Sequence, residues 1–175
     1  MLHGAGTGTE VPLLAGLALA MGERGWDVIR LEQPYRVQGR RAPAPAHQLD
    51  AVVRQVVTDW GGQTPLVLAG RSSGARVACR LASELAAAMV VAFGFPLISP
   101  KNVSRQHELD AAGVPVLVIQ GTRDPFGMPR GSKRRRREVL RVPGADHALE
   151  RSRTRPNPLG QILVEVAERL EMLEV

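Results

Sequence analysis

The residues best suited to chemistry stand in the run Gly70-Arg71-Ser72-Ser73-Gly74. This run follows the apolar residues 66–69 and leads into an apolar pattern with helical spacing. A serine with a glycine two residues to either side, at a sharp turn from strand to helix, is held in a strained backbone conformation with its hydroxyl exposed. The glycines let strand and helix pass closely. The pattern therefore predicts that Ser72 is a nucleophile.

A serine hydroxyl needs a histidine to accept its proton and a carboxylate to orient that histidine. In strand-turn-helix sites of this kind the chain order is serine, acid, histidine. Asp124 comes just after an apolar strand pattern that ends at Gln120, at the strand end where such sites lie. His147 follows the last strand pattern, in a loop that contains glycine. We therefore predict a catalytic triad of Ser72, Asp124 and His147.

Other residues compete for these roles. Asp146 is a rival acid, but it is adjacent to His147, and adjacent side chains generally diverge. Asp124 is alternatively a turn or helix-capping aspartate beside a proline. His47 and His107 lie in loop or helix-start contexts, and no acid precedes them in the required order. The first assignment is preferred.

An acyl-transfer site also needs two amides that point at the developing oxyanion. Ser73 follows the nucleophile and offers one amide, at a helix N-terminus where partial positive charge gathers. The glycine-rich run His3-Gly4-Ala5-Gly6 offers the other, which we assign to Ala5. Such a loop also suits a phosphate, but the acidic residue of the dinucleotide-binding pattern does not end the next strand. No cofactor is therefore expected.

Helical and strand-like patterns alternate along the chain, which predicts βαβ units and a mostly parallel sheet. Helices are expected over residues 13–21, 49–60, 75–85 and 162–173. Strands are expected over residues 26–31, 66–69, 89–93, 114–120 and 138–142. Thr9 is a candidate N-cap of the first helix, and Gly61 and Gly62 should end the second. This order predicts a three-layer αβα sandwich in a single domain over residues 1–175.

The length and composition of the chain limit the functions that it can have. The 175 residues, 44% of them hydrophobic, suffice for one buried core and are too few for two ordinary domains. No apolar run approaches the ~20 residues of a membrane span, and the start lacks the order of a secretory signal, so a cytoplasmic protein without a membrane partner is expected. Cys79 is the single cysteine and is expected to be an inert core thiol. The four histidines show no metal-ligand spacing, so no metal is expected.

The formal net charge is +6, and much of it is concentrated in the run Lys133-Arg134-Arg135-Arg136-Arg137. We interpret this run as a solvated loop, although its field also suits phosphate or acidic groups. Aromatic residues make up only 3% of the chain and offer no stacking platform for single-stranded nucleic acid. A nucleic-acid partner is therefore not expected, whereas homo-oligomerisation stays open.

The start of the sequence is unusual for such a site. Only Met1 and Leu2 precede the glycine-rich loop, which normally follows a central strand with further strands before it. We expect the chain to be shortened at its N-terminus, either genuinely or because its start codon was assigned too late. The second explanation is favoured, because a sheet truncated beside its site leaves an open edge that pairs with other chains.

Taken together, these residues resemble the α/β-hydrolase superfamily, and within it a small, lid-free branch similar to dienelactone hydrolases. The group related to a testis-expressed protein and to a subunit of the nonspecific-lethal chromatin complex is the most similar. The resemblance implies an α/β-hydrolase fold without the usual N-terminal strands and lid. It also implies the Ser72, Asp124, His147 triad and an oxyanion loop at Ala5. The stretches that carry it are residues 3–6, 70–76, 95–97, 120–127 and 144–147.

The sequence thus predicts a serine hydrolase that cleaves a small ester, thioester or lactone through an acyl-serine intermediate. The alternative is a non-catalytic interaction or scaffold protein, because a fold does not guarantee an activity. No long insertion before Asp124 forms a lid, so a shallow site for a small-molecule acyl substrate is expected. Arg71 and Arg76 lie near the nucleophile and either attract an acidic substrate or form surface or helix-packing salt bridges.

Overall fold

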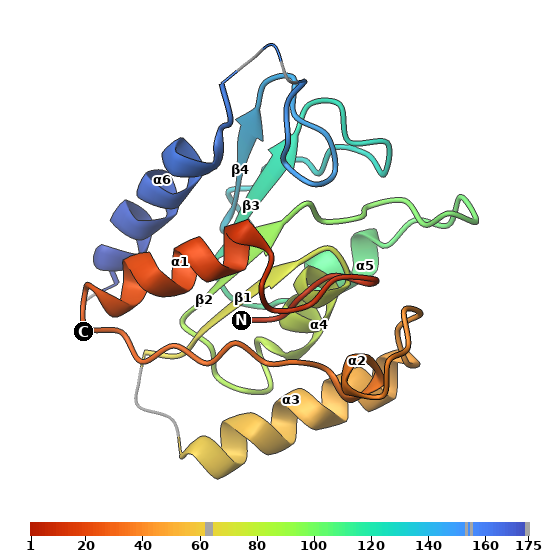
Figure 1. Ribbon diagram of the computed structural model, residues 1–175, viewed down its shortest axis with the longest axis vertical. Coiled ribbons are helices and arrows are strands. Elements are labelled where there is room, and N and C mark those ends of the chain that lie inside the picture. Colours follow the sequence, from red (N-terminus) through yellow and green to blue (C-terminus); the bar gives the residue numbers. More distant parts are fainter. Residues whose placement is uncertain (62–64, 153, 155, 174–175) are drawn as a thin grey trace.

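Four parallel strands form the central sheet of the computed structural model, which describes residues 1–61, 65–152, 154 and 156–173 (Figure 1). The strands lie side by side in chain order. They are β1 (Val67–Arg71), β2 (Met89–Phe93), β3 (Val116–Gly121) and β4 (Arg137–Val142). The helices are α1 (Pro12–Gly22), α2 (Pro34–Val37), α3 (Ala46–Trp60), α4 (Ser73–Leu81), α5 (Gln106–Asp110) and α6 (Leu159–Glu171).

Each face of the sheet carries its own hydrophobic core. Val90 and Val118 belong to one core, and Val91 and Leu117 belong to the other, because successive residues of a strand point to opposite faces. Helices α3, α4 and α5 cover the first face, and α1 and α6 lie side by side on the second (Figure 1). The predicted three-layer αβα sandwich with a parallel sheet is confirmed.

The expected strand over residues 26–31 is the main departure from the prediction. Of these residues only Leu31 makes a β-bridge, and its partner is Leu2, which also bridges Gly70 of β1. An extended segment becomes a strand only where a neighbouring chain pairs with it. Met1 and Leu2 reach only the last residues of this segment, where the Leu31 amide donates to the Met1 carbonyl at 3.0 Å. The predicted strand over residues 26–31 is therefore wrong, apart from the single bridge at Leu31.

The helix ends are partly as expected. Thr9 is not the N-cap of α1, because Val11 occupies that position and no side chain caps the helix. The Thr9 amide and hydroxyl instead donate to one carboxylate oxygen of Glu32, at 3.0 and 3.2 Å. Gly61 ends α3 with a φ of 66°, whereas Gly62 lies outside the described residues. No described helix has both the length and the apolar character needed to cross a membrane.

Candidate active site

Ser72 stands at a sharp turn between β1 and α4. Its φ of 53° and ψ of −112° lie outside the regions that a non-glycine residue ordinarily adopts, as the glycine-flanked pattern predicts. A Cβ on Gly70 would lie 2.4 Å from backbone atoms of Gly74, and a Cβ on Gly74 would lie 2.3 Å from the Leu2 carbonyl oxygen. Neither contact is sterically allowed, so Gly70 is needed for the close passage of β1 and α4, and Gly74 is needed for the close approach of the N-terminal segment to α4.

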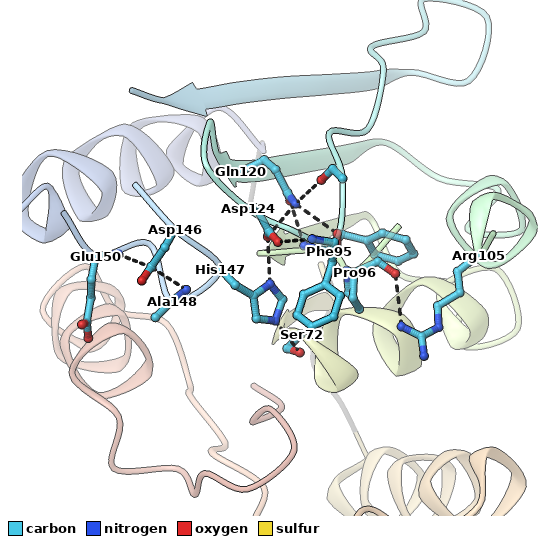
Figure 2. A network of polar contacts seen from close by, with 12 residues as sticks. Ser72, Phe95, Pro96, Arg105, Gln120, Asp124, Asp146, His147, Ala148 and Glu150 are labelled. Atoms are coloured by element: carbon cyan, nitrogen blue, oxygen red, sulfur yellow. Dashed lines mark hydrogen bonds and ion pairs between the residues drawn. The ribbon is translucent and has the colours of Figure 1, made fainter. Parts of the chain in front are cut away.

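Three side chains from separate loops meet at this turn (Figure 2). The Ser72 Oγ lies 2.9 Å from His147 Nε2, and His147 Nδ1 lies 2.8 Å from Asp124 Oδ2. With the proton on Nδ1, the imidazole donates to Asp124 and accepts from the serine hydroxyl. The structure therefore brings together all three residues that the sequence nominates, at distances that allow a proton to pass from Ser72 to His147.

Asp124 is held by more than the histidine. Its Oδ1 accepts the Phe126 amide at 2.8 Å, and its Oδ2 accepts the Gln120 side-chain amide at 2.8 Å. The carboxylate side chain has no solvent exposure. Asp146 is separate from this cluster, because its Oδ1 accepts the Ala148 and Glu150 amides within its own loop. Of the two competing acids, only Asp124 contacts the imidazole.

Gln120 is a site residue that the sequence reasoning did not single out. It is fully buried at the end of β3, where its Oε1 accepts the Phe95 amide at 2.9 Å. Its Nε2 lies near three acceptors, at 3.1 Å from the Phe95 carbonyl and at 2.8 Å from both the Gly127 carbonyl and Asp124. Gln120 thus ties the turn that carries Asp124 to the loop after β2. The sequence does contain a sign of this role, because Gln120 is a polar residue at the end of an otherwise apolar strand pattern.

The imidazole of His147 is positioned by close packing. Gly94 has a φ of 54°, and a Cβ there would lie 2.7 Å from the His147 carbonyl oxygen. The Phe126 ring meets the imidazole edge-on, with the ring centres 4.6 Å apart. A Cβ on Gly121 would lie 2.3 Å from the Asp146 carbonyl oxygen, so the histidine loop also lies directly against the end of β3. Because Gly94 and Gly121 carry no side chains, the loop with His147 can pack directly against the ends of β2 and β3.

The glycine-rich loop lies beside the nucleophile. A Cβ on Gly4 would lie 3.3 Å from the Ser72 Cβ. The buried His3 holds this loop, because its Nδ1 donates to the Gly4 carbonyl at 2.9 Å and its Nε2 accepts the Gln33 amide at 3.0 Å. Within the described residues, the amides of Ala5 and Ser73 donate to no other group. They stay available as the two proposed oxyanion donors.

Arg76 has a structural role beneath the site. It donates twice to Glu108, at 2.5 and 2.7 Å, and Glu108 also accepts Arg80, which in turn pairs with Asp50. Burial raises the pKa of Glu108, but the hydrogen bonds from Arg76 and the charges of Arg76 and Arg80 outweigh it and hold that pKa below its usual value. Of the two arginines near the nucleophile, Arg76 therefore joins a salt-bridge network that fastens α4 to α5 and α3.

The site is open to solvent. The His147 side chain keeps 20% of its surface exposed, and Ser72 is only half-buried. The segments between β2 and β3 are the loop after Phe93 and the short helix α5.

A cavity of about 450 Å³ lies elsewhere, between the segment 26–31, α3 and β1, and none of the three site residues lines it. The hydrogen bonds among Ser72, His147 and Asp124, rather than the size of a cavity, mark the candidate site. Within the described ranges, no three His, Cys, Asp or Glu side chains are grouped as metal ligands.

Comparisons with known proteins concern the family and the fold of the chain. The family model described as "Alpha/beta hydrolase domain" matches residues 1–173. No curated protein matches the sequence. Solved structures do resemble it, among them an alpha/beta superfamily protein from Xanthomonas campestris pv. campestris, with a TM-score of 0.76 and 19% identity over 98% of this chain and 96% of that one.

Two further structures share the fold. A monoacylglycerol lipase from Paleococcus ferrophilus has a TM-score of 0.71 and 17% identity, over 97% of this chain and 92% of that one. A lid-free α/β serine hydrolase from Xanthomonas campestris has a TM-score of 0.55 and 18% identity, over 98% of this chain and 78% of that one. At these identities the likeness shows the fold alone, and support for a hydrolytic function comes from the family model.

Proposed function

The chain belongs to the alpha/beta-hydrolase family, and from that membership we propose that it is a serine hydrolase that cleaves a small ester, thioester or lactone through an acyl-serine intermediate. One observation carries the proposal. An unbroken line of hydrogen bonds runs from buried Asp124 through His147 to Ser72, at the strained turn before α4 (Figure 2). A structural serine needs neither the strain nor the oriented imidazole.

The proposed reaction has two halves. In the first, Ser72 Oγ attacks the substrate carbonyl while His147 Nε2 takes the hydroxyl proton, and Asp124 stabilises the resulting imidazolium. The imidazolium then protonates the leaving alcohol, thiol or, in a lactone, the ring oxygen, and an ester links the acyl group to Ser72. In the second half, water attacks this ester, gives its proton to Nε2 and releases the acid as Ser72 regains its proton.

The tetrahedral intermediates carry a negative charge on the former carbonyl oxygen. We assign its stabilisation to the amides of Ala5 and Ser73, which have no other acceptor within the described residues. The Ser73 amide is the first of α4, whose N-terminal dipole end adds positive potential at the same point. The small-residue character of the loop around Ala5 lets a substrate carbonyl approach the backbone.

A fluorophosphonate probe tests the proposal. The probe phosphonylates an activated serine, so we expect stoichiometric labelling of the wild-type protein at one residue, Ser72. Ser72→Ala should abolish labelling and lower ester turnover by about 10⁶-fold. A folded wild-type protein that resists the probe and hydrolyses no ester would instead favour a non-catalytic interaction protein.

The two aspartates of the sequence provide a matched control. Asp124→Asn should lower turnover by about 10⁴-fold, because the amide favours the wrong imidazole tautomer. Asp146→Asn changes a neighbouring carboxylate that bonds only within its loop, so we expect a loss of less than about tenfold. Equal losses in the two variants would reject Asp124 as the orienting acid.

A further inference from the structure

Arg71 is the immediate neighbour of the proposed nucleophile, at the end of β1. Its Nη1 lies 2.9 Å from the position that a Cβ on Gly4 would occupy, and the Ser72 Cβ lies 3.3 Å from that same position. The guanidinium and the nucleophile therefore flank one glycine of the proposed oxyanion loop. A substrate whose carbonyl is held between Ser72 and the proposed oxyanion loop would therefore lie near the guanidinium.

This guanidinium lies beside the proposed nucleophile and has no counter-ion among the described residues. No described carboxylate lies within 4.0 Å of it, and its nitrogens donate to no described group. Arg76 and Arg80, by contrast, pair with acids at 2.5 Å. Arg71 is only half-buried, and its nitrogens are not among the fully buried atoms without a partner, so they reach solvent.

Three acidic groups act on it from nearby, and none of them pairs with it within the described residues. Burial lowers the pKa of Arg71 more than the charges of Glu150, Asp146 and Asp124 raise it. Asp124 already accepts three hydrogen bonds, and the Asp146 carboxylate accepts two amides of its own loop. A partly desolvated guanidinium without a partner raises the free energy of the folded protein, and an anionic ligand removes that penalty.

We propose that Arg71 binds a carboxylate of the substrate, so that the preferred substrates are esters or thioesters that carry a free carboxylate in addition to the bond that is cleaved. This inference rests on the proposed function and adds a substrate class to it. The planar fork of the guanidinium matches a carboxylate with two parallel hydrogen bonds, which gives orientation as well as attraction. One ion pair then places the scissile carbonyl between Ser72 and the amides of Ala5 and Ser73.

The experiment compares substrates that differ only in charge. In the first pair both substrates are para-nitrophenyl esters. One is the monoester of glutarate, and the other has an isopropyl group in place of the free carboxylate of glutarate. The second pair carries the difference in the leaving group, as para-carboxyphenyl acetate and para-isopropylphenyl acetate. We expect the wild-type protein to prefer the charged member of at least one pair, by about tenfold or more in kcat/KM.

Variants of Arg71 test whether its guanidinium causes the preference for the charged substrate. Arg71→Gln should remove it, and Arg71→Lys should keep part of it, because lysine retains the charge without the fork. Arg54→Gln is the matched control: it removes one positive charge from α3, where Arg54 pairs with Glu84 at an exposed position, and should leave the preference unchanged. A loss in this control as well would attribute the preference to net charge and overturn the proposal.

Two other outcomes would also overturn it. One is a wild-type protein that hydrolyses esters and takes the fluorophosphonate probe, yet shows no preference in either pair. The other is a preference that survives Arg71→Gln and disappears in Arg105→Gln, whose guanidinium donates to the Pro96 carbonyl beside the site (Figure 2). If neither the probe nor any ester reacts, the proposed function itself has failed, and that result is distinct from both.

Discussion

The Gln120 side-chain amide donates at 2.8 Å to the same Asp124 oxygen that accepts the proton-bearing nitrogen of His147. Gln120, at a fully buried strand end, and His147, on a loop, thus donate to the same carboxylate oxygen. Because Gln120 also bonds the backbone of Phe95 and Gly127, it fixes where Asp124 can stand. The orientation of the imidazole depends on a residue that never touches it.

Replacing this amide should therefore impair the site. Gln120→Met keeps the volume but loses every hydrogen bond, so we expect turnover to fall by about 10- to 100-fold. The free energy of unfolding should fall by about 2 kcal/mol, because backbone groups are left unsatisfied. Kinetics at a temperature where the variant is fully folded separate the two effects. Gln55→Met is the control, since Gln55 also donates to an aspartate, Asp59, but on the surface of α3. Wild-type turnover by folded Gln120→Met would remove Gln120 from the site.

Gly94 should be required for the position of the histidine. Gly94→Ala puts a methyl group against the His147 carbonyl, so the loop must move, and a shift near 1 Å costs about 100-fold in turnover. Gly39→Ala provides the comparison: its φ of 75° is also positive, but nothing lies within 4 Å of the added Cβ. Both variants pay about 1 kcal/mol of backbone strain, visible in thermal melts. Similar activities in the two would show that the contact with His147 does not matter.

The Glu108 network should make stability depend on pH. Glu108→Gln leaves Arg76 with a weaker partner, and we expect a loss of about 3 kcal/mol in the free energy of unfolding at neutral pH. Because the folded-state pKa of Glu108 is lowered, its contribution is complete above the unfolded value of about 4.3 and disappears as the pH falls through the folded value. The difference between wild type and variant, measured by urea titration, should be constant from pH 6 to 7 and shrink below about pH 4.

The exposed pair of Arg54 and Glu84 serves as the control for that measurement. Glu84→Gln removes a carboxylate with the same two-pronged geometry, but at a solvent-exposed position. Solvent screens such a pair, so little change in stability is expected. A loss as large as that of Glu108→Gln would mean that burial does not distinguish the two ion pairs.

Cys79 should be chemically inert in the folded protein. Burial raises the pKa of its thiol to about 12, and the side chain, on the buried face of α4, has no exposed surface. Since the thiolate is the reactive form, iodoacetamide at pH 8 should not modify the native protein. Mass spectrometry should find complete alkylation once the chain is unfolded. Rapid modification of the native protein would show that the core around α4 opens readily.

The elements could be predicted because local patterns determine them. Apolar residues at helical spacing gave α1, α3 and α6, and short apolar runs gave β1, β2 and β3, since each element buries a face set by its own period. The segment 26–31 shows the limit. Its residues favour extension, but a strand also needs a partner, and the pairing of Leu2 with Leu31 is a property of the whole sheet.

The sequence by itself determined which residue types were available for chemistry and in what order, because the glycine-flanked Ser72, the strand-end Asp124 and the loop-borne His147 are each recognisable locally. Their catalytic roles stay a proposal. Only the tertiary structure decided that they touch, that Gln120 supports Asp124, and that Arg76 pairs with an acid whereas Arg71 pairs with none among the described residues. Such contacts join residues far apart in the chain, and the packing of loops over the end of an open parallel sheet sets their distances to within a hydrogen-bond length.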